Sequence, residues 1–138
     1  MWPRIDGMRT MEIGDPYGIR PRLNELILSG AKRATVGLLA EYIEEDEALE
    51  HVGERLVLVD DEGDRLAILE VDRVAHHRFG AIPWEVVAAE NEGHATIDEW
   101  KAGHLRFWTG QGVDVHDDTD LVAIFFHLVD GGVDPGLS

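Results

Sequence analysis

The chain contains no cysteine, and basic residues are scarce among its charged residues. The absence of cysteine excludes a disulfide framework, a thiol nucleophile and a thiolate metal site. Lys and Arg total 12 against 28 Asp and Glu, which gives a formal net charge of −16. A protein with this excess of carboxylates repels a long polyanion at a distance, so we predict no binding of a DNA duplex.

Long hydrophobic runs are also missing. The longest apolar stretches fall well short of the roughly 18–20 residues that span a bilayer. Residues 1–20 mix Arg, Glu, Asp, Gly and Pro, without the apolar core of a signal peptide. We therefore expect a cytoplasmic protein that has no membrane partner.

Motifs of the common nucleotide-dependent and metal-dependent enzymes are absent. The chain has no Walker A sequence, no Gly-x-Gly-x-x-Gly and no Gly-x-Ser-x-Gly elbow. His76 and His77 are adjacent, so on a strand they would point to opposite faces and would not share an ion. We expect no metal and no cofactor.

The length of 138 residues, 44% of them hydrophobic, is typical of one globular domain. Residues 1–20 are rich in Gly and Pro and are expected to form a loosely packed N-terminal arm. The folded domain should cover residues 21–130, and the Gly-rich residues 131–138 should form a flexible tail. The acidic run 44–47 is interpreted as a solvated face.

Helix signals mark two main segments. Pro21–Ser29 has apolar residues at helical spacing, and Gly30 follows where a left-handed C-terminal cap belongs. Thr96 and Glu99 make a capping box for a helix over Ile97–Thr109. A further short helix should open at Pro83.

Strand signals lie between and after the helices. Glu54–Asp60 and Arg65–Val74 are rich in strand formers, and the residues between them have hairpin-turn chemistry. Leu121–Val129 is a nearly continuous apolar strand. Because strands and helices mix without regular βαβ alternation, the pattern favours an α+β fold.

One short segment suggests chemistry. Lys32 precedes Thr35 by three residues, so the two can lie on the same side of a turn. A neutral lysine can accept the proton of a threonine hydroxyl, which is a poor nucleophile until a base adjoins it. The spacing alone favours the simpler interpretation, an exposed lysine and a threonine that caps a turn.

The segment Ser29–Thr35 also resembles the Gly-x-Lys-x-x-Thr motif that opens the ASCH domain. The stretch Ala89–His94, then Asp98–Lys101 and His104, resembles the second block of that domain, and Val52-Gly53 fits a Val-Gly-Asp that the family often has before its first strand. The resemblance runs from about Leu26 to Val129, and the acidic insert after the first motif makes the chain similar to the longer members of the family.

The resemblance implies a PUA-like mixed β-barrel flanked by helices. One bacterial branch of the family hydrolyses N4-acetylcytidine to cytidine and acetate with a Lys, a Thr and a Glu. Carried over by motif, these catalytic residues are Lys32, Thr35 and Glu90, which should converge in one cleft, with Glu92 as the substitute for Glu90. Substrate-binding residues would be Gly30, Ala31, Arg33, Trp100 and His104, the first two through backbone amides at an oxyanion.

Three functions remain open at this stage. The first is an amide hydrolase for an acylated nucleoside, in which Lys32 is either a base or a permanently charged clamp. The second is a binding module for RNA or a modified nucleotide, which requires basic residues such as Lys32, Arg73 and Lys101 to gather in one cleft. The third is a ribonuclease that uses Glu90, Glu92 and His94. The expected partner is a small-molecule nucleoside or a short RNA, and the oligomeric state is not predicted.

Overall fold

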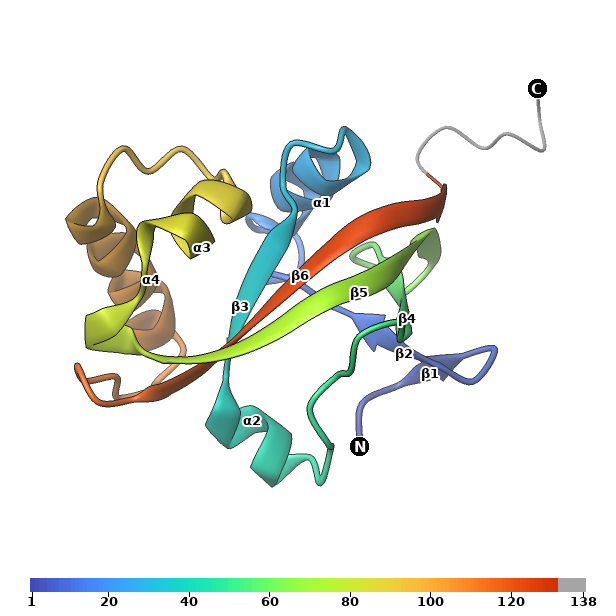
Figure 1. Cartoon of the computed structure of the whole chain (residues 1–138). Helices are drawn as coiled ribbons and strands as arrows, with labels where there is room; N and C mark the ends of the chain where they lie inside the picture. Colours follow the sequence, from blue (N-terminus) through green and yellow to red (C-terminus); the bar gives the residue numbers. More distant parts are fainter. Residues whose placement is uncertain (132–138) are drawn as a thin grey trace.

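A six-stranded sheet forms the scaffold of the protein, of which the computed structural model describes residues 1–131 (Figure 1). The strand order is β1-β2-β4-β5-β6-β3. The strands are β1 (Arg4–Ile5), β2 (Met8–Met11), β3 (Ala34–Leu38), β4 (Arg55–Val59), β5 (Arg65–Arg78) and β6 (Asp120–Gly131). The helices are α1 (Arg20–Leu28), α2 (Leu39–Glu44), the 3₁₀ turn η1 (Phe79–Ala81), α3 (Trp84–Glu90) and α4 (Ile97–Gly110).

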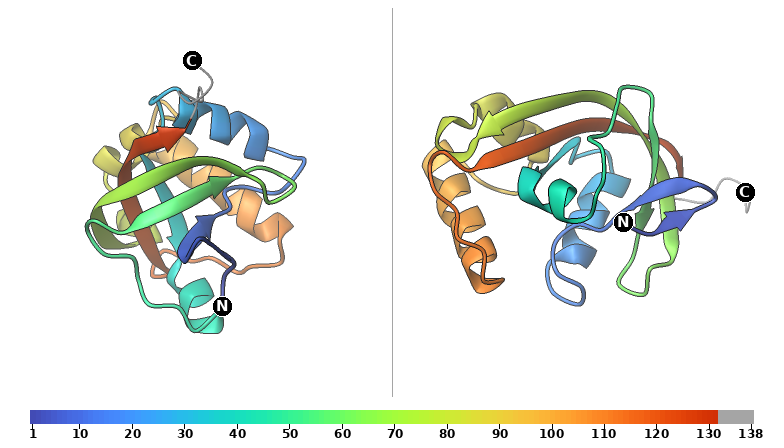
Figure 2. Two further views of the ribbon diagram at one scale, coloured as in Figure 1. Left: turned by 90° about the vertical axis from the view of Figure 1, so that its right-hand side faces the viewer. Right: turned by 90° about the horizontal axis from the view of Figure 1, so that it is seen from below.

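The predicted hairpin lies at the centre of this sheet. Strands β4 and β5 pair antiparallel, and β5 pairs along most of its length with β6. Register shifts within the β5–β6 pair accompany a strong curvature, and the two strands arch over α1 and α2 (Figure 2). The α+β class is therefore confirmed.

The predicted closure into a barrel is wrong. The edge strands are β1 and β3, and β6 lies between β5 and β3 instead of closing the sheet. The apolar inner face is covered by helices, because Leu23 and Ile27 of α1 pack in one core cluster with Leu56 and Leu69 of the sheet. Burial that a closing strand would provide in a barrel is provided here by α1 and α2.

The N-terminal arm was expected to be loosely packed, but it forms part of the sheet and of the core. Strand β2 pairs parallel with β4, and Met11 and Ile13 are buried in the core. The parallel pairing has no local sequence signal, because its two strands are separated by more than forty residues. The predicted flexible tail lies, apart from Gly131, outside the described residues.

The predicted helix boundaries agree closely with the structure. Gly30 follows α1 with a φ of 83°, the left-handed conformation that glycine adopts without strain. Thr96 and Glu99 form the reciprocal capping box at the start of α4. Helices α3 and α4 enclose a second core around Trp100 and Trp108 at one end of β5 and β6 (Figure 1). No helix within residues 1–131 is long and apolar enough to cross a membrane.

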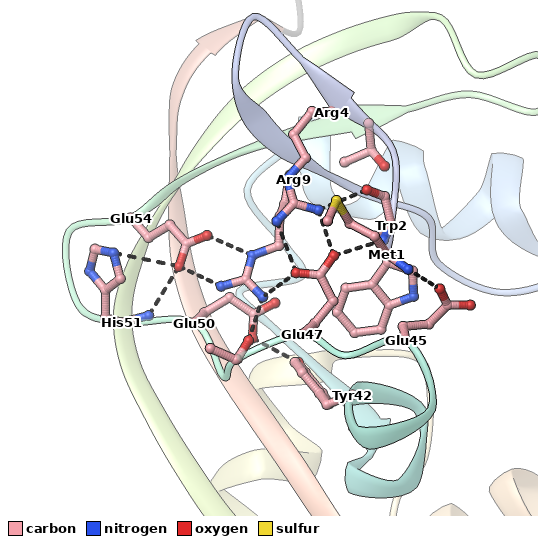
Figure 3. A network of polar contacts seen from close by, with 12 residues as sticks. Met1, Trp2, Arg4, Arg9, Tyr42, Glu45, Glu47, Glu50, His51 and Glu54 are labelled. Carbon is pink, nitrogen blue, oxygen red and sulfur yellow. Dashed lines mark hydrogen bonds and ion pairs between the residues drawn. The ribbon is translucent and has the colours of Figure 1, made fainter.

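A buried arginine fastens the arm to the segment after α2 (Figure 3). Arg9 is 7% exposed and makes two hydrogen bonds to Glu54, of 2.8 and 2.9 Å. Glu47 pairs with Arg4 at 2.5 Å, and this contact lowers the pKa of Glu47 to about 2. The acidic run is therefore not wholly a solvated face, because its last carboxylate is enclosed by arginines.

We predict that Arg9→Ala lowers the free energy of unfolding by about 3 kcal/mol, because it leaves Glu54 without its partner in a largely buried place. Arg106→Ala, at an exposed position of α4, should change it by less than about 0.5 kcal/mol. Urea unfolding of both variants measures the difference. Equal effects of the two substitutions would contradict a structural role for the Arg9 network.

Candidate functional site

The candidate site is built around Lys32, a lysine with almost no exposure to solvent. Its exposed fraction is 1%, although lysine is rarely buried unless it is paired. The residue lies between α1 and β3, and its backbone N–H donates to the carbonyl oxygen of Leu26 at 2.9 Å. This bond turns the chain back after the left-handed Gly30 and directs Lys32 inward.

The C-terminal end of α3 is tied to the same segment. The N–H of Arg33 donates to the carbonyl oxygen of Ala89 at 2.8 Å. The side-chain amide of Asn91 donates to the carbonyl oxygen of Ala31 at 3.0 Å. Asn91 itself is left-handed, with a φ of 51°, a conformation that asparagine tolerates better than most residues. These bonds place Glu90 opposite Lys32.

The Lys32 Nζ atom contacts three oxygens. It lies 2.6 Å from the carbonyl oxygen of Ala34, 3.3 Å from Glu90 Oε2 and 2.6 Å from Glu92 Oε2. An ammonium group has three N–H donors and no acceptor, so it satisfies all three oxygens at once. A neutral amine would direct a lone pair at one of these acceptors. The geometry thus favours a charged Lys32 over a lysine that accepts a proton.

Glu90 is the most enclosed carboxylate of the site, with an exposed fraction of 1%. Its Oε1 atom accepts a hydrogen bond of 2.5 Å from Trp100 Nε1 and lies 3.4 Å from His104 Nε2. Burial alone would favour the neutral acid, but the charge of Lys32 and the bonds from His104 and Trp100 lower the pKa of Glu90 to about 2. Glu90 is therefore a carboxylate at neutral pH.

His104 is the second nitrogen base that faces these carboxylates. Its Nδ1 atom lies 3.0 Å from the carbonyl oxygen of Trp100, which can only accept, so Nδ1 holds a proton. Its Nε2 atom faces Glu90 and, at 4.0 Å, Glu92. Burial lowers the pKa of His104, but the hydrogen bond and charge of Glu90 outweigh it and raise the pKa above its usual value. The ring also stacks on Trp100 with centroids 4.0 Å apart, which favours the imidazolium form.

A cavity of about 440 Å³ adjoins this cluster. Thr35, Glu90, Glu92, His94 and His104 line it, whereas Lys32 lies behind the two carboxylates. The volume is in the range of small-ligand sites. The structure therefore pairs Lys32 with Glu90 and places Glu90 and Thr35 on the wall of one cavity, which Lys32 itself does not line.

Other residues predicted to bind substrate lie away from the cavity lining. Trp100 is fully enclosed in the core and reaches the site only through its bond to Glu90. The N–H groups of Gly30 and Ala31 donate to Ile27 and to the Ser29 hydroxyl, so neither is free for an oxyanion. The side chain of Arg33 is exposed outside the cavity lining. His104 alone of this group lines the cavity.

His94 was a candidate of the ribonuclease hypothesis and lines the cavity, whereas Tyr42 and Glu50 were not predicted from the sequence. His94 lines the cavity beside Gly103, where an added Cβ atom would approach His94 Nε2 to 3.0 Å. A glycine in the middle of a predicted helix was the available signal, because glycine is unfavourable there without a packing reason. Tyr42 and Glu50 also line the cavity. They flank the acidic run 44–47, which the sequence predicts to be a solvated face, so the sequence alone marks neither residue as a candidate site residue.

The donor set of Glu90, Glu92 and His104 has the spacing of a metal site, since their ligand atoms lie within 4.8 Å of one another. The Lys32 ammonium, however, already lies against Glu90 Oε2 and Glu92 Oε2. A divalent cation would share these carboxylates with a buried positive charge that cannot withdraw into solvent. The residues therefore fit the ammonium better than a metal ion.

The ASCH domain family model matches residues 10–130, and the chain belongs to this family. A protein from Enterococcus faecalis V583 has a similar crystal structure, with a TM-score of 0.78 and 26% identity over 92% of this chain and 79% of that one. An ASCH domain from Lactobacillus crispatus has a TM-score of 0.71 and 26% identity, over 84% of this chain and 75% of that one. ASCH from Zymomonas mobilis, 9% identical with a TM-score of 0.51 over 84% and 69%, shows the shared fold alone. No curated protein matches the chain significantly.

The charged state of Glu90 gives a prediction about stability and pH. Its pKa is lower in the folded protein than its usual 4.5, so its contribution is complete above pH 4.5 and is lost as the pH falls toward about 2. The pKa of Glu47 is also lowered, so Glu47 adds to the loss of stability over the same pH range. Urea unfolding across this range should show a steeper loss for the wild type than for Glu90→Gln. Identical slopes would show that Glu90 is not held as a carboxylate.

Proposed function

We propose that the protein is an amide hydrolase that acts on an acylated nucleoside such as N4-acetylcytidine. The observation that supports this most directly is that a charge-balanced cluster opens on the cavity whose wall carries Thr35. A hydroxyl can act as the nucleophile of acyl transfer, a carboxylate as the base that activates it and an imidazolium as the acid for the leaving group.

In the proposed first half-reaction, the Thr35 hydroxyl attacks the acyl carbonyl carbon. Its proton passes to Glu92 Oε1, the carboxylate oxygen that Lys32 does not occupy. The tetrahedral intermediate collapses when the bond between the acyl carbon and the nitrogen breaks, and the His104 imidazolium gives its Nε2 proton to the leaving amine. The products are cytidine and an acyl ester of Thr35.

In the second half-reaction, water attacks the ester. Neutral His104 takes one proton from the water, and protonated Glu92 returns its proton to the Thr35 oxygen as the ester bond breaks. The acid is released with Glu92 again a carboxylate and His104 again an imidazolium. Atoms and charges balance without a cofactor.

Lys32 and Glu90 serve as positioning residues in this scheme. Lys32 holds Glu92 at 2.6 Å, and Glu90 holds the His104 ring through the 3.4 Å contact. This assignment replaces the lysine base of the sequence-based hypothesis with Glu92, because the three donors of Lys32 are already in use. It also keeps Lys32 charged, as the clamp hypothesis did.

The alternative of an RNA-binding module receives less support. The basic residues that it would need are dispersed: Arg73 pairs with Glu85, Lys101 pairs with Asp117, and neither lines the cavity. A ribonuclease that uses Glu90, Glu92 and His94 receives less support as well. Its two carboxylates are already paired with the Lys32 ammonium, so they are less available to bind a metal ion.

We predict that Thr35→Ala abolishes release of acetate from N4-acetylcytidine, whereas Thr35→Ser retains a measurable rate because it keeps the hydroxyl. Glu92→Gln should lower kcat by about 100-fold or more, the usual contribution of a general base. Liquid chromatography of the cytidine formed measures both.

Thr109→Ala, at an exposed position near the end of α4, is the matched control and should retain the wild-type rate. Circular dichroism spectra should show that all variants are folded. Full activity in Thr35→Ala, or no turnover of any acylated nucleoside by the wild type, would contradict the proposed function.

A further inference from the structure

A second polar group lines the same cavity outside the charged cluster. Tyr42 of α2 and Glu50 are both buried, and the Tyr42 hydroxyl donates to Glu50 Oε1 at 2.7 Å (Figure 3). The Trp2 ring meets Tyr42 edge-on, with centroids 4.8 Å apart, and lines the cavity beside it. The proposed acyl transfer uses none of these residues.

Glu50 is unusual among the buried charged side chains because no cation pairs with it. Arg9 directs its nitrogens to Glu54, Glu47 and the Ala48 carbonyl, and within residues 1–131 no ion pair forms with Glu50. Burial raises the pKa of Glu50, although the hydrogen bond from Tyr42 and the charge of Arg9 act in the opposite direction. A carboxyl group on a cavity wall has several acceptor positions, so it can accept hydrogen bonds from a bound molecule in addition to the bond from Tyr42.

The position of this pair suits the far end of a nucleoside. Strand β3 runs from the Thr35 region to Leu38, where α2 begins, and three residues of strand span about 10 Å. Tyr42 follows one turn later in α2, and Thr35 and Tyr42 both line the same cavity. An acylated base at Thr35 would therefore place its sugar near Tyr42 and Glu50.

We infer that Tyr42 and Glu50 form a subsite for the ribose hydroxyl groups of the ligand, an inference that rests on the proposed function. The hydroxyls of a ribose can donate hydrogen bonds to the Glu50 carboxylate, and the Tyr42 oxygen can accept a further bond while its own O–H continues to donate to Glu50. The same carboxylate disfavours an anionic group at this end of the cavity. The ligand is therefore a neutral riboside.

The test compares cytidine with 2′,3′-dideoxycytidine, which keeps the base and the sugar ring but lacks both ribose hydroxyls. Binding to the full chain is followed by NMR chemical-shift titration, which needs no turnover. The wild type should bind cytidine about tenfold more tightly or better, the effect of a hydrogen bond to a charged group. Tyr42→Phe and Glu50→Gln should each reduce this preference.

A matched control is available in the second tyrosine. Tyr17 donates to Glu62 at 3.2 Å on the exposed surface, outside the cavity lining. Tyr17→Phe and Glu62→Gln should leave the preference for cytidine unchanged. Tyr42→Phe keeps the buried ring, so the inference stays testable if Glu50→Gln does not fold.

The outcomes separate this inference from the proposed function. Equal binding of the two nucleosides by the wild type, or no binding of either, overturns the subsite. A preference for cytidine that Tyr42→Phe removes supports the subsite even if N4-acetylcytidine is not hydrolysed. Hydrolysis at equal rates for N4-acetylcytidine and its 2′,3′-dideoxy analogue would support the proposed hydrolase and contradict the ribose subsite.

Discussion

The buried ammonium of Lys32 is the constraint on which the rest of the site depends. A charge withdrawn from water must be matched by nearby charges and hydrogen bonds, because an unpaired one is strongly destabilising. Ala34, Glu90 and Glu92 provide these contacts from two separate parts of the chain. The requirement therefore fixes the end of α3 against the segment before β3, and Glu90 in turn fixes His104 of α4.

This arrangement divides the cluster into a closed half and an open half. Lys32, Glu90 and Trp100 are almost fully enclosed and form a rigid support. Glu92 and His104 line the cavity, where a ligand can reach them. Enclosed charged residues of this kind can hold reactive side chains in a fixed position beside a substrate, so little reorganisation is needed during the reaction. The same cavity extends to Tyr42 and Glu50, so one space offers both a reactive end and a recognition end.

Local signals in the sequence predicted local structure well. Gly30, Thr96 and the hairpin residues act through their own neighbours, and the structure has them as predicted. Pairing between distant segments had no such signal, and the parallel β2–β4 pair was not predicted. The sheet stays open because helices, not a closing strand, cover its inner face.

The candidate site was predicted in part for the same reason. The motif pointed to Lys32, Thr35 and Glu90, but the sequence could not show that two carboxylates would share one ammonium. Trp100 was expected at the substrate because tryptophan serves both stacking and packing, and only the folded chain shows that it is enclosed. Tyr42 and Glu50 carry no motif at all, and their pairing depends on how the segment after α2 returns to the sheet.

The central claim is that Lys32 is a charged group whose place depends on Glu90 and Glu92. The most direct test is the free energy of unfolding of Lys32→Met, with and without Glu90→Gln and Glu92→Gln in the same chain. Lys32→Met alone should lower the free energy of unfolding by about 3–5 kcal/mol, because it leaves the buried Glu90 and the partly buried Glu92 without their cation. The triple variant should be more stable than Lys32→Met, since no carboxylate is left in it without its ammonium partner. A triple variant whose loss is the sum of the separate losses would contradict the account.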